Sequence, residues 1–249
     1  APMPSLYDQL RQTMPQLRLT PLLIVVNVLV FGAMLLSGAG LWHSQNGVQL
    51  AWGANFGPAT QDGEWWRLGS AMFLHFGLLH LALNMWALWD AGQWVERMYG
   101  HFRFSAIYFV AGLAGNLLSL VVHQGHAVSG GASGAIFGLY GALLSYLWLE
   151  RSRIRRSEFR WLFWAAVGFS VASIIFGLMV PGIDNAAHIG GLIGGLLMGI
   201  LIKPDTGVAV MPPRIKLTAG LVFIAIVCAM VANIPQLAYR WSDEKLVQQ

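Results

Sequence analysis

The chain places a serine and a histidine, each beside glycines, in two otherwise apolar segments. Ser133 lies in residues 129–135 (SGGASGA), and His188 follows 55 positions later in residues 185–191 (NAAHIGG). Polar side chains are costly inside a membrane and therefore need a reason. A serine activated by a histidine base can attack a carbonyl carbon. The pair thus supplies the nucleophile and the base that are the minimum for cleaving a peptide bond where little water is present.

The composition indicates a membrane protein. The 249 residues are 56% hydrophobic and 10% charged, whereas soluble domains carry about 25% charged residues. The net charge of +4 is small and gathers in loops, which is typical of membrane topology and argues against a nucleic-acid partner. The single cysteine, Cys228, excludes an intrachain disulfide. Residues 1–12 lack the basic-then-apolar pattern of a cleaved signal peptide, so we expect none there.

Seven apolar segments approach the length of about 20 residues that a spanning helix needs. We therefore expect an all-α, polytopic helical bundle with spans at 21–39, 77–97, 103–122, 133–149, 161–180, 186–202 and 216–236. The expected division is a cytoplasmic N-terminal segment at 1–20, a six-span core at 21–202, a linker and seventh span at 203–236, and an external tail at 237–249.

Basic residues gather in alternate loops, and this bias sets the orientation of the spans. Residues 151–160 contain five arginines, whereas residues 123–132 and 181–185 contain no lysine or arginine. We therefore expect the N-terminus in the cytoplasm and the C-terminus outside. A chain this small favours a bacterial inner membrane.

The segment before the second span is unusual, because residues 40–68 are rich in tryptophan and poor in charge. A solvated loop would be more polar. We expect this segment to lie in the membrane interface and to pack against the side of the bundle.

The fourth expected span is short. Its 17 residues, 133–149, cover about 25 Å, against about 30 Å of hydrocarbon. Because the arginines that follow hold its cytoplasmic end at the surface, Ser133 should lie below the outer surface. Residues 123–132 must then dip into the protein, which irregular backbone tolerates only where it is buried or lines a wet cavity. The sequence therefore predicts a small wet cavity that ends at Ser133.

Small residues repeat every four positions on the fourth and sixth spans, at Gly134, Gly138 and Ala142, and at Ala187, Gly191, Gly195 and Gly199. Such stripes let helix backbones approach closely. Because Ser133 and His188 each adjoin the start of a stripe, packing through the stripes would bring their side chains level. The alternative is that Ser133 only caps a helix and His188 only satisfies a carbonyl group.

A second polar group consists of His75, His80 and Asn84. His80 and Asn84 are four residues apart, so they share one helix face. With His188 the two histidines could hold a metal, but no acidic residue or cysteine accompanies them at zinc-like spacing, so we expect none. Their N–H groups could instead stabilise an oxyanion, together with backbone amides at the start of the fourth span.

No carboxylate is an evident third member of the group. Asp184 lies four residues before His188, where a helix cap is the simpler role, and Asp90 and Glu96 lie toward the cytoplasmic end of their span. We therefore expect a dyad in which packing orients His188, with Phe137 stacked on its imidazole.

Together these motifs resemble the rhomboid family of intramembrane serine proteases. The resemblance covers residues 20–202 and rests on 131–134 (GASG), 187–191 (AHIGG) with Gly195, the His75, His80 and Asn84 set, Trp66-Arg67, and 92–96 (GQWVE). Phe137 departs from the tyrosine that the family often has there, but a phenylalanine can still stack.

The resemblance implies a six-helix core with a seventh C-terminal helix, as in the six-plus-one subclass. It implies Ser133 as nucleophile, His188 as general base, and an oxyanion hole made by His80, Asn84 and the backbone amides of Ala132 and Ser133. The implied supporting residues are Gly131, Gly134, Phe137, Gly191, Gly195, His75, Trp66 and Arg67. The implied partners are transmembrane protein substrates and the lipid bilayer, and no cofactor is needed.

Two other functions fit the sequence. A polar cavity in a seven-span bundle would suit a small-solute transporter whose histidines relay protons, and a chaperone could bind membrane helices without cutting them. A transporter should depend on Asp90, Glu96 or the histidines and tolerate loss of the Ser133 hydroxyl. A chaperone should bind its substrates equally well without that hydroxyl.

Overall fold

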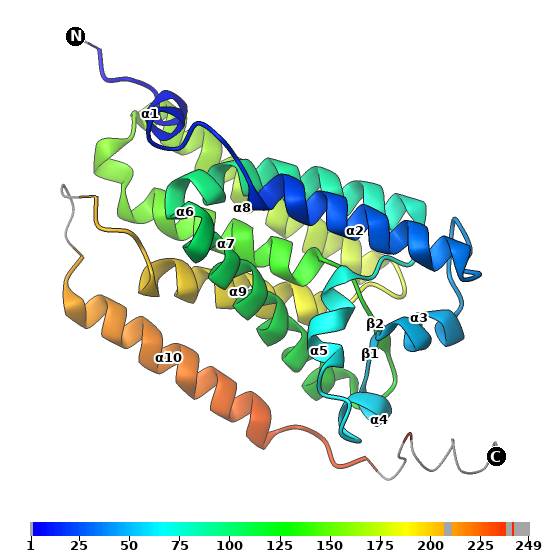
Figure 1. Ribbon diagram of the computed structural model, residues 1–249. Helices are drawn as coiled ribbons and strands as arrows, with labels where there is room; N and C mark the ends of the chain where they lie inside the picture. Colours follow the sequence, from blue (N-terminus) through cyan, green and yellow to red (C-terminus); the bar gives the residue numbers. More distant parts are fainter. Residues whose placement is uncertain (1, 207–210, 238–240, 242–249) are drawn as a thin grey trace.

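The described residues form a bundle of long helices joined at one end by short helices and two short strands (Figure 1). The computed structural model describes residues 2–206, 211–237 and 241. The helices are α1 (Leu6–Thr13), α2 (Leu19–Leu36), α3 (Asn46–Trp52), α4 (Gly57–Thr60), α5 (Arg67–Ser70), α6 (Leu78–His123), α7 (Ser133–Leu149), α8 (Arg156–Met179), α9 (Asn185–Leu201) and α10 (Pro213–Ala232), with single 3-10 turns at Ala71–Phe73 and Arg151–Arg153. The strands β1 (Asn55–Phe56) and β2 (Val128–Ser129) pair antiparallel.

Helix α6 contains two of the expected spans. It is interrupted at Gly100, whose φ of 83° and ψ of 165° are not helical, and a positive φ of this kind suits glycine because it has no Cβ. Four helices, α2, α6, α8 and α10, are long and apolar enough to cross a membrane, and α7 and α9 are shorter apolar helices. Each expected span coincides with a helix to within a few residues, so the predicted all-α multi-span bundle is confirmed. Most of the expected tail at 237–249 lies outside the described residues.

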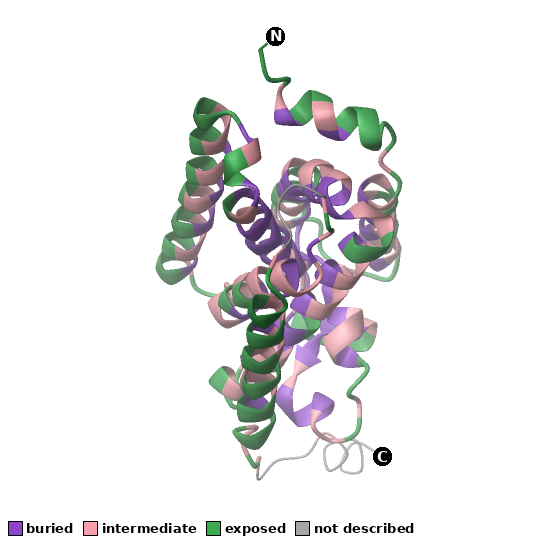
Figure 2. Ribbon diagram, turned by 90° about the vertical axis from the view of Figure 1, so that its left-hand side faces the viewer, coloured by how far each residue is buried: buried purple, intermediate pink, exposed green. Residues whose placement is uncertain are grey.

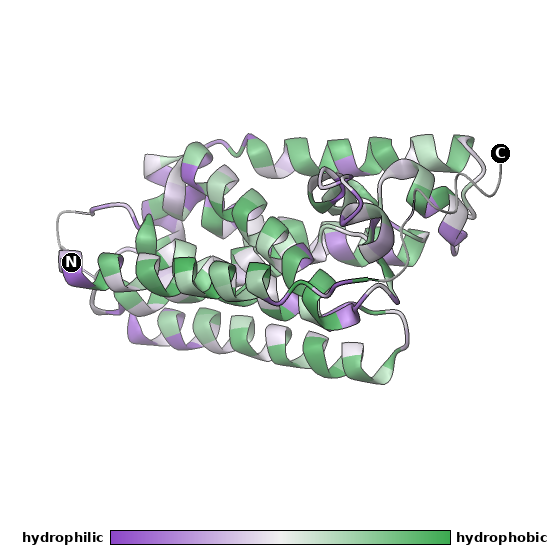
Figure 3. Ribbon diagram, turned by 90° about the horizontal axis from the view of Figure 1, so that it is seen from below, coloured by the Kyte–Doolittle hydropathy of each residue, from purple (hydrophilic) through white to green (hydrophobic). Residues whose placement is uncertain are grey.

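The core of the bundle is built around α7. Of its 17 residues, 13 are buried, whereas α8 and α10 expose most of their length (Figure 2). The exposed faces of these outer helices are apolar, as Figure 3 shows. An apolar exposed surface suits contact with lipid, where the helix satisfies its own backbone hydrogen bonds.

Helices α7 and α9 meet backbone to backbone through the two small-residue stripes. A Cβ atom placed on Gly191 would overlap the carbonyl oxygen of Gly134, and one on Gly195 would overlap that of Gly138. Only glycine permits so close an approach at these positions. The predicted packing through the stripes is therefore confirmed, and it fixes the relative height of the first residues of both helices.

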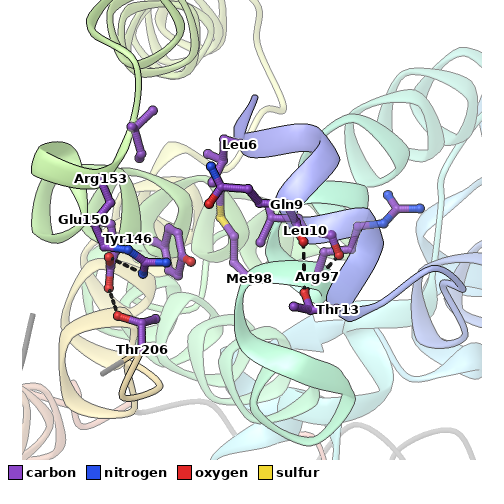
Figure 4. Close-up of a pocket in the computed structure, with 11 residues that line it drawn as sticks. Leu6, Gln9, Leu10, Thr13, Arg97, Met98, Tyr146, Glu150, Arg153 and Thr206 are labelled. Carbon is purple, nitrogen blue, oxygen red and sulfur yellow. Dashed lines mark hydrogen bonds and ion pairs between the residues drawn. The ribbon is translucent and has the colours of Figure 1, made fainter. Parts of the chain in front are cut away.

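The arginine-rich end of the bundle lies opposite the end where α7 begins. At the arginine-rich end, α1 is attached to α8, since the Leu6 backbone amide donates to both carboxylate oxygens of Glu158 at 2.9 and 3.0 Å. A cavity of about 280 Å³ lies beside α1, and Arg97 and Arg153 are among the side chains that line it (Figure 4). The candidate site residues Ser133, His188, His80 and Asn84 do not line this cavity.

The segment between α2 and α6 packs against the opposite end of the bundle. The side-chain amide of Asn55 donates to the backbone carbonyl of Asn116 on α6 at 3.1 Å. The side-chain amide of Asn116 in turn donates to the backbone carbonyl of Leu68 at 2.7 Å. In the strand pair, Asn55 lies opposite Ser129. The prediction that this segment packs against the bundle is confirmed.

Trp66 and Arg67 differ in exposure, although the Arg67 guanidinium carbon lies over the Trp66 ring, 4.8 Å from its centroid. The Trp66 side chain is exposed, whereas Arg67 is only 4% exposed. The Arg67 guanidinium pairs with Glu64 at 2.7 Å and donates to the carbonyls of Leu50 and Ala54 at 2.8 and 3.0 Å. Arg67 therefore holds the segment together from inside, whereas the Trp66 side chain is exposed at the surface.

Candidate active site

The first residue of α7 and the fourth residue of α9 face each other. His188 Nε2 lies 2.9 Å from Ser133 Oγ. The stripe packing of the two helices brings these side chains level, as the sequence suggested. Both residues are partly exposed, so the pair remains accessible to another molecule.

Phe137, one turn after Ser133, stacks on the imidazole of His188. The two ring centroids are 4.6 Å apart and the ring planes differ by 15°. This is the expected contact, and it restricts the rotation of the imidazole.

A hydrogen bond from Asn185 also orients His188, which the sequence interpretation missed. Asn185 Nδ2 donates to the carbonyl of Ile174 at 3.0 Å, which leaves Asn185 Oδ1 as an acceptor 3.2 Å from His188 Nδ1. In a neutral imidazole the proton is therefore assigned to Nδ1, and Nε2 presents a lone pair to the Ser133 hydroxyl. A signal was available, because Asn185 and His188 are three residues apart and share a helix face.

Helix α8 leaves room for this amide only because residue 177 is a glycine. A Cβ atom on Gly177 would overlap the side-chain amide of Asn185. The expectation that packing alone orients His188 is thus incomplete, since α8 also holds Asn185 in place.

His80 and Asn84 direct N–H groups to one point above the start of α7. The Phe76 amide donates to His80 Nδ1 at 3.2 Å, so the proton of a neutral His80 lies on Nε2. Asn84 Nδ2 is buried and has no hydrogen-bond partner among the described residues. A Cβ atom on Gly131 would lie 2.9 Å from His80 Nε2 and 3.5 Å from Asn84 Nδ2. The bare glycine therefore leaves space in front of both donors.

The two expected backbone donors differ in availability. The Ala132 amide donates to Nε2 of the buried His75 at 3.4 Å, so it is already engaged. Ser133 is the first residue of α7, and an amide at that position has no partner within its own helix. Of the two amides, that of Ser133 is the better placed to receive a ligand.

Asp184 caps α9, and its carboxylate makes no described hydrogen bond to the side chains of Ser133 or His188. Its Oδ1 accepts from the Ala187 amide at 3.0 Å, which confirms the predicted cap. Burial on its own would raise the pKa of this carboxyl group, but hydrogen bonds from His123, Ser119 and Ser129 and from the Ala187 amide outweigh it and hold that pKa at about 2. Asp184 is therefore a carboxylate at neutral pH.

The carboxylates of α6 serve other contacts. Glu96 accepts hydrogen bonds from the backbone amides of Arg18, Leu19 and Thr20 at 2.8–2.9 Å and so caps the start of α2. Asp90 accepts from the Tyr140 hydroxyl at 2.6 Å. Neither carboxylate has a described hydrogen bond to the side chains of the Ser133–His188 pair.

A hydroxyl that faces an imidazole lone pair can attack a carbonyl group, and the two N–H donors beside it can stabilise the oxyanion that results.

Comparison with known proteins gives a family match over these same residues. The family model described as "Rhomboid domain" matches residues 62–205, a range that includes Ser133, His188, His80 and Asn84.

Curated relatives carry the same family name. Rhomboid protease GluP of Bacillus subtilis (strain 168) is 41% identical over 181 residues, which cover 71% of this chain and 33% of that protein. RHOMBOID-like protein 5 of Arabidopsis thaliana is 40% identical over 154 residues, which cover 59% of this chain and 48% of that protein. The chain thus matches between a third and a half of the length of these relatives.

The family match covers more than half of the chain, and the helices have the length and apolarity of membrane spans. Motifs, helix packing and relatives therefore agree, and this integral, multi-pass membrane protein belongs to the rhomboid family.

Proposed function

We propose that this protein is an intramembrane serine endopeptidase that cleaves transmembrane helices of other proteins through a Ser133–His188 dyad. The observation that carries the proposal is the 2.9 Å contact between His188 Nε2 and Ser133 Oγ. It is supported by Asn185, whose amide oxygen assigns the imidazole proton to the far nitrogen.

The mechanism begins with a substrate helix that unwinds, because a regular helix keeps its carbonyl groups in its own hydrogen bonds. His188 Nε2 takes the proton of Ser133, and Ser133 Oγ attacks the exposed carbonyl carbon. The oxyanion accepts hydrogen bonds from His80 Nε2, Asn84 Nδ2 and the Ser133 amide.

Collapse of this intermediate completes the first half of the reaction. The imidazolium of His188 gives its proton to the leaving amine, the C–N bond breaks, and the acyl group stays on Ser133 as an ester. His188 then takes a proton from water, which attacks the ester. As the second intermediate collapses, His188 returns this proton to Ser133 Oγ, the C–O bond to the serine breaks, and the new carboxyl end is released. No step needs a metal or an organic cofactor.

The charge pattern supports an orientation for this chemistry. Helix α2 begins and α10 ends at opposite ends of the bundle (Figure 1), and the arginine-rich end lies away from Ser133. By the positive-inside tendency, we place the N-terminus in the cytoplasm, the C-terminus outside, and cleavage near the outer leaflet. A bacterial inner membrane is the location that we propose.

The direct test treats the detergent-solubilised protein with a fluorophosphonate probe and, separately, with a single-span reporter protein. We expect one phosphonylated serine, which peptide mass spectrometry maps to Ser133, and a loss of reporter cleavage in proportion to labelling. Ser170 on α8 is the internal control, because its buried hydroxyl has no described partner and should stay unmodified. A folded protein that binds the reporter but neither labels nor cleaves would support the chaperone function instead.

Replacing Asn84 with alanine should lower kcat for reporter cleavage by about 10-fold or more, because one oxyanion donor is lost while others remain. The matched control is Asn27→Ala, which removes a buried amide that bonds the Leu23 carbonyl on α2 at 2.8 Å. Steady-state cleavage assays at a temperature where both variants are folded give the comparison. If Asn84→Ala keeps the wild-type kcat, Asn84 has no part in the mechanism.

A further inference from the structure

A second contact runs parallel to the one between Ser133 and His188. Ser129 Oγ donates to Asp184 Oδ2 at 2.6 Å. Ser129 lies four residues before Ser133, and Asp184 lies four residues before His188, so both contacts join positions that are 55 residues apart. The segment 129–133 and the segment 184–188 are therefore joined by two side-chain contacts, Ser129–Asp184 and Ser133–His188.

The tie at Ser129 acts on the irregular backbone at 130–132. This stretch connects β2 to α7, and Gly131 in its middle has a φ of 130°, a conformation that costs glycine little and leaves the stretch free to rearrange. Its far end is fixed, because α7 packs on α9 through the stripes. Its near end, Ser129, is held by Asp184 through the side chain and by the strand pairing opposite Asn55 through the backbone.

This stretch of backbone is the surface on which His80 and Asn84 converge. The space above Gly131 lies in front of His80 Nε2 and Asn84 Nδ2, and the Gly131 amide donates to the carbonyl of Ala71 at 2.8 Å. A shift of Ser129 would move this backbone relative to the two donors, while the stripes would still hold Ser133 close to His188.

Asp184 is suited to this task because it only accepts hydrogen bonds. Besides Ser129 and the Ala187 amide, it accepts from Ser119 Oγ at 2.5 Å, and His123 Nε2 lies 3.0 Å away. A carboxylate has about four acceptor sites, so these four donors use its capacity. They come from α6, β2 and α9, which one side chain thus joins.

We propose that Asp184 is a positioning residue that, through Ser129, holds the backbone at 130–132 in register with His80 and Asn84. The inference rests on the proposed peptidase function and deepens it. The Asp184 carboxylate makes no described hydrogen bond to the side chains of Ser133 or His188, although the Asp184 backbone carbonyl accepts from the His188 amide at 3.3 Å. The effect of this carboxylate through Ser129 is therefore indirect.

Two serines on the same carboxylate oxygen make a matched pair for the test. Ser119 and Ser129 both donate to Asp184 Oδ2 at similar distances, but only Ser129 leads into the 130–132 backbone. Ser129→Ala should lower kcat for reporter cleavage at least about 5-fold with KM unchanged, since a displacement of about 1 Å can cost up to about 100-fold. Ser119→Ala should lower the melting temperature by a similar amount and keep kcat within about two-fold of wild type.

Two more variants separate positioning from general weakening of the fold. Ser129→Thr keeps the hydroxyl and should restore most of the kcat that Ser129→Ala loses. Asp184→Asn keeps the helix cap but replaces one acceptor oxygen with a donor, and it should lower kcat at least as much as Ser129→Ala. The double variant should be no slower than Asp184→Asn alone, because both changes remove the same link.

The outcomes distinguish the two proposals. If wild type cleaves the reporter and Ser129→Ala and Ser119→Ala have the same kcat, Asp184 does not position the site, and the peptidase function still stands. Additive losses in the double variant would also overturn the positioning role. A folded wild type that neither labels nor cleaves would overturn the peptidase function and the positioning role together.

Discussion

Replacing Ser133 with alanine should abolish reporter cleavage and fluorophosphonate labelling while the protein stays folded. Loss of the nucleophile removes the covalent route, and we expect the cleavage rate to fall by about 10⁴-fold or more. The described hydrogen bond of Ser133 Oγ is to His188, so the change should cost only about 1 kcal/mol of stability. Cleavage assays, labelling and thermal unfolding in the same detergent measure the three quantities.

The control for this variant is Ser170→Ala. Ser170 is a buried serine in α8, and its hydroxyl has no described partner, so labelling and cleavage in this variant should match wild type. Cleavage that persists in Ser133→Ala would remove Ser133 as the nucleophile. A Ser133→Ala protein that still moves a small solute across a membrane would support the transporter function.

Replacing Gly191 with valine should unfold the bundle or force α7 and α9 apart. A Cβ atom at this position overlaps the carbonyl oxygen of Gly134, and backbone cannot move aside as a flexible side chain can. Overpacking of a core typically costs about 1–3 kcal/mol and sometimes more, and a clash with backbone belongs at the upper end. We expect the melting temperature to fall on the order of 10 °C and cleavage to be lost, because Ser133 and His188 would no longer meet.

Gly168→Val on α8 is the matched control for the glycine variant. A Cβ atom at Gly168 has nothing within 4 Å, so the added side chain meets only the surroundings of the bundle. Its melting temperature and cleavage rate should remain near those of wild type. Equal effects of the two valines would mean that close backbone contact between α7 and α9 does not hold the site together.

Local patterns in the sequence were enough to predict the helices and their packing faces. Apolar length gives the spans, because a bilayer demands about 20 residues of unbroken apolar helix. Four-residue spacing of glycines gives the contact face of α7 and α9, because small residues are what close backbone contact requires. From these two patterns it follows that Ser133 and His188 lie level, as the structure shows.

Three features of the site depend on contacts that no local pattern specifies. The Asn185 amide is aimed at His188 only because its other atom bonds the Ile174 carbonyl and Gly177 leaves it room, and both lie on a different helix. The Ala132 amide, expected to be free, is engaged by His75. Arg67, which belongs to the segment expected in the membrane interface, turns inward to the carbonyl groups of Leu50 and Ala54.

The sequence by itself determined the class of fold, the positions of the apolar helices and which side chains could do chemistry, because membrane length, helix period and residue type act along the chain. Only the tertiary structure decided which nitrogen of the His188 imidazole carries the proton, which backbone amides lack a partner, and which elements the Asp184 carboxylate connects. Those properties depend on the direction of individual hydrogen bonds between distant segments. Such directions are settled only when α6, β2, α7, α8 and α9 pack together.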